Sequence, residues 1–270
     1  MSAKNTRAAV PRAVKTCILI LPMKVFVIIP AAGLGTRMVT SSTRKPGPPK
    51  QFAELAGSPI LVHTLRRFAA SKAIDEIYLA LRKNEMDGFR SHLEHEAHDI
   101  LQKTVHFVEG GEHRQESVAN ALAAVSAKPD DIILVHDAVR PFVTREIIED
   151  VIASASKHGA AIAGIPAIDT VKQVDRTADG ALITATVPRE RVVLAQTPQG
   201  FRYSVIKKAF DDAIADGFTG TDEASLVERS GQEVAVVMGS PRNIKITNPS
   251  DMELAEFYLK SPGSLNTRAS

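Results

Sequence analysis

Short apolar runs alternate with helical patterns along most of the chain, and this alternation limits the folds open to it. The runs are rich in β-branched residues and almost continuously apolar, which is typical of strands buried on both faces. The stretches between them repeat apolar residues at spacings of three or four, which places those residues on one helix face. Such alternation predicts right-handed crossovers and a mostly parallel sheet flanked by helices, an α/β fold. The predicted strands are 24–29, 76–81, 104–110, 131–137, 159–165 and 233–238.

Six segments carry the helical pattern. The first repeats apolar residues between Ile60 and Phe68, and the last has a good start signal, with Asn248 as the cap and Pro249 in the first turn. Ligands of a Rossmann-like sheet bind beyond the carboxyl ends of its strands, so loops that follow strands are the first places to look for a site. The predicted helical segments are 60–68, 118–125, 147–152, 203–215, 222–230 and the stretch after Asn248.

Residues 166–190 interrupt the alternation. Two strand-like stretches flank the turn sequence "RTADG", which predicts a β-hairpin. A lone two-stranded hairpin is only marginally stable in water, so we expect it to pack on something outside its own sheet. A second copy of the protein is the simplest partner, which makes this hairpin a predicted dimerisation arm. Since there is no internal repeat and no linker, we predict one domain, 23–260, that carries the arm.

The two ends of the chain differ from the rest. Residues 1–22 are basic and lack acids, and their apolar run "CILILP" is shorter than the roughly 7–15 residues of a signal peptide's apolar region. We expect a disordered extension before a domain that opens at Met23, with a targeting segment as the alternative. The stretch 261–270 is expected to be a disordered tail.

Composition excludes several classes of protein. The formal net charge of the 270 residues is +2, so no overall basic field indicates a nucleic-acid partner. The single cysteine, Cys17, cannot form an internal disulfide, and no Cys/His spacing indicates zinc. No apolar run approaches the roughly twenty residues of a membrane span. These features together predict a cytoplasmic protein.

The loop "PAAGLGTRM", residues 30–38, follows the first predicted strand. It is not a Walker loop, because no Gly-Lys-Ser/Thr follows, and Met38 stands where a dinucleotide fingerprint has its third glycine. Its small residues would let a base or a phosphate approach the backbone, and Arg37 adds a fixed charge. Lys50, in "PPKQF", adds another. A plain tight turn with solvated surface charges is the alternative interpretation.

Eight segments, taken in order, resemble the 2-C-methyl-D-erythritol 4-phosphate cytidylyltransferases. They span 24–259. The resemblance implies a homodimeric enzyme that uses Mg²⁺ and joins CTP to a polyol phosphate, with release of pyrophosphate. A sister group acting on ribitol 5-phosphate is very similar, so the polyol is less specific than the nucleotide. The segments are "IIPAAGLGTRM", "PPKQF", "GGEHRQESV", "HDAVRPF", "DTVK", "AQTPQGF", "TDEASLVE" and "NIKIT".

The resemblance also implies roles for individual residues. Three cations, Arg37, Lys50 and Lys245, would hold the triphosphate and stabilise the pentacoordinate phosphorus. Asp137 would contact the polyol substrate and lie near Mg²⁺, although taken alone it is equally an ordinary capping or loop residue. The nucleotide would be bound by Ala31, Ala32, Gly33, Gly35, Gly110, Gly111, Glu112 and Ser117, and the polyol phosphate by Asp137, Arg140, Thr197 and, from a partner's arm, Thr170 and Arg189.

One departure from the family lies between Arg37 and Lys50, where the extra stretch "STRKPG" lengthens the loop. It brings Lys45, which competes with Lys50 for the phosphate role; "PKQ" followed by phenylalanine favours Lys50. Other functions are alternatives to this one. A nucleotide-sugar glycosyltransferase lacks support, because no Asp-x-Asp motif follows a strand, and a sugar-1-phosphate nucleotidyltransferase usually has a longer chain and other substrate motifs. A non-catalytic nucleotide-binding regulator would be favoured by loss of the cations, but all three are present.

Overall fold

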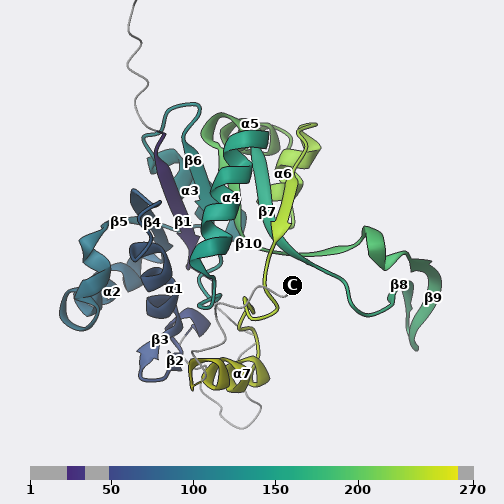
Figure 1. The fold of residues 1–270 in the computed structure, drawn as a ribbon, viewed down its shortest axis with the longest axis horizontal. Coiled ribbons are helices and arrows are strands. Elements are labelled where there is room, and N and C mark those ends of the chain that lie inside the picture. The colour runs from purple at the N-terminus through teal and green to yellow at the C-terminus, as the bar shows by residue number, and fades with distance from the viewer. Residues whose placement is uncertain (1–22, 34–48, 261–270) are drawn as a thin grey trace, which may run out of the picture.

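The computed structural model describes residues 23–33 and 49–260, and its centre is a seven-stranded sheet (Figure 1). The strand order is β11-β7-β10-β6-β1-β4-β5, and neighbouring strands are parallel except where β10 meets β6 and β7. The predicted α/β fold with a mostly parallel sheet is therefore confirmed. The strands are β1 (Val25–Pro30), β4 (Glu76–Leu81), β5 (Thr104–Glu109), β6 (Ile132–Val135), β7 (Ala160–Pro166), β10 (Val193–Arg202) and β11 (Ala235–Met238).

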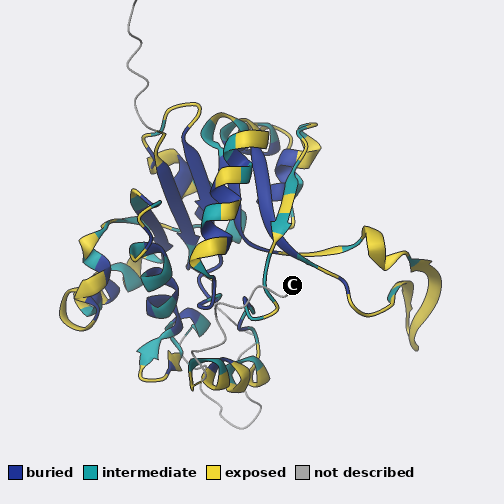
Figure 2. Cartoon of the chain, in the orientation of Figure 1, coloured by how far each residue is buried: buried dark blue, intermediate teal, exposed yellow. Residues whose placement is uncertain are grey.

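Helices cover both faces of this sheet, which explains why its central strands β1 and β6 are buried and almost continuously apolar (Figure 2). In β1, alternate residues enter two different cores: Val27 packs on one face and Ile28 on the other. Both side chains are fully buried. The first face is covered by α1 (Ile60–Ala69), α2 (Lys83–Glu96) and α4 (Arg145–His158), and the second by α3 (Arg114–Ala124), α5 (Tyr203–Ala215) and α6 (Glu223–Arg229).

A third, smaller core lies under α7 (Pro249–Lys260) and beside the short strands β2 (Glu54–Leu55) and β3 (Ser58–Pro59). The predicted start of α7 is confirmed, because Asn248 Oδ1 accepts a hydrogen bond from the Asp251 amide at 3.0 Å. Among the residues that the structure describes, no helix is long and apolar enough to cross a membrane. The predictions for 1–22 and 261–270 lie outside the described residues.

In the seven-stranded sheet, β10 is the strand that the sequence pattern does not predict; outside the sheet, α2, β2 and β3 are also not predicted. It runs antiparallel between β6 and β7, and Gln199 lies opposite Val135. Its register against β7 shifts between Ala195 and Gln199, and Pro198 lies within this shift. Since proline donates no ladder hydrogen bond, an irregular point is where a central strand can hold one. This strand brings Thr197 to the edge where β6 ends.

The predicted hairpin is present as β8 (Val171–Thr177) and β9 (Gly180–Val187), and it projects away from the sheet (Figure 1). Within the described residues these two strands pair only with each other. Almost all of their residues are exposed, as Figure 2 shows. The apolar side chains are no exception, since Leu182 is 66% exposed and Ile183 is 65% exposed.

Candidate active site

Two loops meet where the strand order of the sheet reverses. β1 and β6 are parallel neighbours, and the chain leaves them through residues 31–33 and 136–140. A reversal of strand order opens a crevice beyond the carboxyl ends of the strands. Here the crevice is a pocket of about 410 Å³, and both loops line it. Other segments complete its wall with Lys50, Gly111, Glu112, Ser117 and Lys245.

Gln51 holds the β1 side of this pocket together. Its Nε2 donates to the carbonyl oxygens of Ala31 at 2.7 Å and Gly33 at 3.1 Å. Gln51 and Lys50 belong to one short 3-10 helix, Lys50–Phe52, so this anchor also places Lys50 at the pocket. Gln51 is not among the residues predicted from the sequence, although it lies within the quoted motif "PPKQF".

The opposite wall depends on glycine at two positions. A Cβ at Gly110 would lie 2.4 Å from the Ala32 Cβ, and a Cβ at Gly111 would lie 2.3 Å from the Glu116 Cβ. Neither distance is possible, so the loop before α3 packs this closely only with glycine. Ser117 Oγ then accepts the Gly111 amide at 3.1 Å. Gly111 and Ser117 line the pocket, whereas Gly110 packs behind it against Ala32.

Asp137 is the centre of a buried ionic cluster. Its carboxylate is 8% exposed and contacts Lys245 Nζ at 2.9 Å, Arg114 Nε at 3.2 Å and Arg140 Nε at 3.3 Å. Burial alone would raise the pKa of Asp137, but Arg114, Lys245 and Arg140 outweigh it and hold that pKa well below its usual range. Asp137 is therefore ionised at neutral pH.

Arg114 extends this cluster to a second carboxylate. Its Nη1 lies 2.6 Å from Glu223 Oε1, at the start of α6. Burial works against the charge of Arg114, but Glu223 and Asp137 raise its pKa above the ordinary value. Neither Arg114 nor Glu223 is among the residues predicted from the sequence, although each lies in a quoted motif, "GGEHRQESV" and "TDEASLVE".

A second pocket, of about 220 Å³, shares part of its wall with the first. Arg114, Asp137 and Lys245 line both pockets. The second pocket adds Arg140 and Thr197 of the predicted residues, together with Gln196, Gln199, Thr221 and Asp222. Cations set between two adjoining pockets can neutralise two anions that meet there, because attraction is stronger in a partly buried site than in water.

His136 supports this wall from behind. It is fully buried, and burial lowers its pKa to about 4, so its ring is neutral at pH 7. Thr197 Oγ1 accepts the Asp137 amide at 3.0 Å, which leaves the hydroxyl proton to donate to His136 Nδ1 at 3.1 Å. The ring's Nε2–H then donates to the carbonyl oxygen of Arg140 at 3.1 Å. The neutral ring thus links β10, through Thr197, to the segment that follows β6, through Arg140.

Five of the predicted site residues are not part of the lining of these two pockets: Gly110 packs behind the wall, two lie on the arm and two lie outside the described residues. Thr170 and Arg189 lie on the arm, where Arg189 Nη1 donates to the carbonyl oxygen of Ile168 at 2.8 Å. Gly35 and Arg37 lie outside the described residues, as does Lys45.

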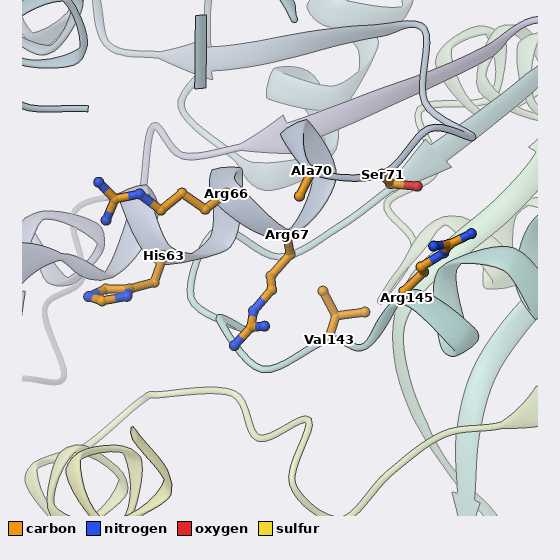
Figure 3. A pocket seen from close by; sticks show the side chains of 7 residues that line it. All are labelled: His63, Arg66, Arg67, Ala70, Ser71, Val143 and Arg145. Atoms are coloured by element: carbon orange, nitrogen blue, oxygen red, sulfur yellow. The ribbon is translucent and has the colours of Figure 1, made fainter. Parts of the chain in front are cut away.

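Another pocket, of about 320 Å³, lies apart from this site against α1 and the start of α4 (Figure 3). Its basic side chains do not converge: the guanidinium groups of Arg66 and Arg145 point to opposite sides. Each meets its own carboxylate, Asp99 at 2.9 Å and Glu149 at 2.6 Å. Arg67, the third arginine of the lining, donates from Nε to the carbonyl oxygen of Pro141 at 3.0 Å, so the three guanidinium groups have separate partners.

The chain was compared with known proteins. The family model described as 2-C-methyl-D-erythritol 4-phosphate cytidylyltransferase matches residues 25–261. Proteins of that name from Acidobacterium capsulatum and Solibacter usitatus are 55% and 51% identical, over 90% and 91% of this chain and 100% and 99% of their own lengths.

Solved structures agree with the sequence relatives. The 4-diphosphocytidyl-2C-methyl-D-erythritol synthase of Anaerococcus prevotii has a TM-score of 0.73 and 32% identity, and the match covers 88% of this chain and 99% of that one. The 2-C-methyl-D-erythritol 4-phosphate cytidylyltransferase of Francisella tularensis has a TM-score of 0.71 and 35% identity, covering 87% of this chain and 99% of that one. The chain therefore belongs to the 2-C-methyl-D-erythritol 4-phosphate cytidylyltransferase family.

Proposed function

We propose that the chain transfers the cytidylyl group of CTP to 2-C-methyl-D-erythritol 4-phosphate and releases pyrophosphate, a step in the synthesis of isoprenoid precursors. Family membership supports this reaction. The observation that carries it is the wall of Arg114, Asp137 and Lys245, which is shared by two adjoining pockets. A reaction that joins two polyanions needs positive charge at their meeting point.

The phosphate monoester of the polyol is the nucleophile and attacks the α-phosphorus of CTP in line. It is already ionised, so the reaction depends on positioning and charge neutralisation rather than on a strong base. In this proposal Lys50, Lys245 and Arg37 stabilise the negative charge on the phosphorus centre. Lys245 is held ready by Asp137 at 2.9 Å. Each such contact is worth about 3 kcal/mol in the transition state.

The larger pocket is assigned to the nucleotide. Ala31, Ala32 and Gly33 give it a floor with almost no side chain, which suits a planar base or a phosphate. Gly111, Glu112 and Ser117 supply backbone and small polar groups that can contact the cytosine and the ribose. Gly110 fixes the shape of that wall, and Gly35 belongs to the proposed phosphate loop.

Magnesium is proposed as the metal, and Asp137 is the residue that would hold it. No group of three or more histidine, cysteine or acidic side chains among residues 23–33 and 49–260 could form a metal cage. One ionised carboxylate nevertheless fits Mg²⁺, which takes its other ligands from phosphate oxygens and water. Asp137 Oδ1 has Arg114 as its hydrogen-bond donor and a second lone pair to offer. Bound there, Mg²⁺ would neutralise part of the negative charge of the phosphates.

The smaller pocket is assigned to the polyol phosphate, with Asp137, Arg140 and Thr197 from the same chain. Thr170 and Arg189 are proposed to complete it from the arm of a second copy, so that the active protein is a homodimer. The arm's exposed apolar residues support this assignment. No nucleic acid or membrane is a proposed partner, and a cytoplasmic location is proposed because the fold needs no disulfide.

A pyrophosphate-release assay tests the proposal. CTP, ATP, GTP and UTP are each combined with methylerythritol phosphate or ribitol 5-phosphate, with and without Mg²⁺. We expect turnover only with CTP and a divalent cation, and the highest kcat/KM with methylerythritol phosphate. A higher kcat/KM with ribitol phosphate would reassign the polyol, and binding of CTP without turnover would indicate a regulator.

A further inference from the structure

We propose that Glu223 is a positioning residue for the cytidylyl transfer: it fixes the Arg114 guanidinium between two carboxylates and thereby sets the wall that both substrates share. This inference rests on the proposed function of the Asp137 cluster. Glu223 itself lines neither pocket. Its effect on the reaction would therefore pass through Arg114.

Burial makes Glu223 unusual. Its side chain is 2% exposed, and Oε2 meets no hydrogen-bond partner in the described part of the chain. The charge that it faces, Arg114, lies 109 residues away in sequence and 2.6 Å away in space. A well-packed apolar residue would serve stability as well as or better than a buried ion pair. The buried carboxylate of Glu223 is therefore better explained by a need to hold the Arg114 guanidinium in one position than by stability.

The geometry of Arg114 explains that requirement. It uses Nη1 for Glu223 at 2.6 Å and Nε for Asp137 at 3.2 Å. Because the guanidinium is rigid and planar, fixing one nitrogen fixes the other. Arg114 then occupies Asp137 Oδ1, while Oδ2 faces Lys245 at 2.9 Å. A lysine at position 114 could not make both contacts from two separate nitrogens.

The start of α6 does not need Arg114 to stay in place. Asp222 Oδ1 caps the helix by accepting the Ser225 amide at 3.0 Å. Gln199, from β10, donates to Asp222 Oδ2 at 2.8 Å and accepts the Ala224 amide at 3.0 Å. A Glu223→Gln variant therefore keeps these anchors and nearly the same side-chain volume, while it loses the charge.

Removing the charge of Glu223 should affect CTP binding and the rate of the chemical step differently. Burial raises the pKa of Glu223, and Arg114 at 2.6 Å opposes that rise. With both carboxylates ionised, three cations (Arg114, Arg140 and Lys245) face two anions, so Glu223→Gln raises the net charge of the cluster from one to two. CTP should bind as well as before or better, while Arg114 loses its fixed orientation. We expect kcat to fall about tenfold or more, because small displacements of positioning groups slow the chemical step, and KM for CTP to stay level or fall.

The experiment is a double-mutant cycle on kcat with Arg114→Gln, Glu223→Gln and the double variant, each checked by circular dichroism. If Glu223 acts through Arg114, the double variant is no slower than Arg114→Gln alone. Losses that multiply would mean that Glu223 acts independently of Arg114 and would overturn the inference, as would wild-type kcat in Glu223→Gln. The matched control is Glu149→Gln, which removes an exposed carboxylate that also lies 2.6 Å from an arginine. It should leave kcat unchanged.

A further variant decides the matter if Glu223→Gln does not fold. Arg114→Lys keeps the charge but loses the fork, so its kcat should fall about tenfold with CTP binding retained. Wild-type kcat in Arg114→Lys would overturn the inference. Wild-type protein without turnover would instead contradict the proposed function, so the two failures are distinguishable.

Discussion

The carboxyl edge of the sheet and the arm differ in how far their side chains are buried within the chain. At the edge, the two carboxylates are buried, and the paired charges come from different elements: Asp137 after β6, Arg114 on α3 and Glu223 on α6. On the arm, β8 and β9 pair only with each other and expose Leu182 and Ile183. The edge is organised within one chain, whereas the arm gains nothing from its apolar residues until another surface covers them.

The two regions also differ in the free energy that their side chains contribute. Burying one leucine or isoleucine side chain stabilises a protein by about 1.5–3 kcal/mol, and the exposed arm residues do not make this contribution. The buried cluster has already met the cost of desolvating its charges, which leaves its cations oriented before substrate arrives. Disruption of the edge should therefore slow chemistry, and disruption of the arm should affect association and the polyol phosphate.

The largest effect is expected from the cations at the edge. Lys50→Ala, Lys245→Ala and Arg37→Ala should each lower kcat about 100-fold while CTP binding changes little, because their charge acts mainly on the transition state. Steady-state pyrophosphate release measures kcat and KM. If a variant keeps more than about a tenth of wild-type kcat, its activation free energy has risen by less than roughly 1.4 kcal/mol, and the role of its residue is misassigned. Lys45→Ala is the control and should be mild.

Stability at acid pH should depend on His136. Its pKa is about 4 in the folded protein and about 6.5 when unfolded, so the unfolded state binds the proton first as pH falls. The stabilisation is complete above pH 6.5 and should be lost toward pH 4, at up to about 1.4 kcal/mol per pH unit. Urea unfolding between pH 7 and pH 4 should show a shallower decline for His136→Gln than for wild type. Equal slopes would mean that the ring is not held neutral.

The fold was largely predictable because its signals are local. Periodicity identifies β1, β4 and every helix except α2, and the turn sequence identifies the hairpin β8–β9. β10 was not predicted, because Pro198 and two glutamines interrupt its apolar pattern. Those features follow from its place in the sheet: the proline sits in the register shift, and Gln199 is turned to the start of α6. No local rule contains that information.

The site was predictable only in part for a related reason. Asp137 follows a strand, so its place at the sheet edge could be foreseen, and Lys50 lies in a recognisable motif. The roles of Arg114 and Glu223 become visible only in their contact, which joins residues 109 positions apart in sequence. The role of Gln51 becomes visible only in its hydrogen bonds to Ala31 and Gly33. A single sequence shows which residues are charged but not which charges meet.

An intermediate effect is expected from the arm's polar residues. Arg189→Ala should raise KM for the polyol phosphate about tenfold, the loss expected from one charged contact, while CTP affinity stays near normal.

Mixing Arg189→Ala with Arg37→Ala should then restore activity. In a mixed dimer one site carries both lesions and the other carries none, so recovery reaches at most about half of the wild-type value per site. Native mass spectrometry confirms the mixed dimers, and mixed dimers without recovery would mean that the arm serves its own chain.

The smallest effect on the fold itself is expected from the arm's apolar residues. Leu182→Ser with Ile183→Ser should change the free energy of unfolding of the monomer by no more than about 0.5 kcal/mol, because both side chains are already exposed. The same change should weaken the dimer about 100-fold, since it removes two side chains that association would bury. Ile214→Ser is the matched control, because Ile214 is also 65% exposed but lies on α5, away from the arm. Sedimentation velocity across a dilution series should shift only the arm variant toward monomer. An equal shift in both variants, or in neither, would show that the arm is not the interface, and the contrast between a self-contained sheet edge and a dependent arm would fail.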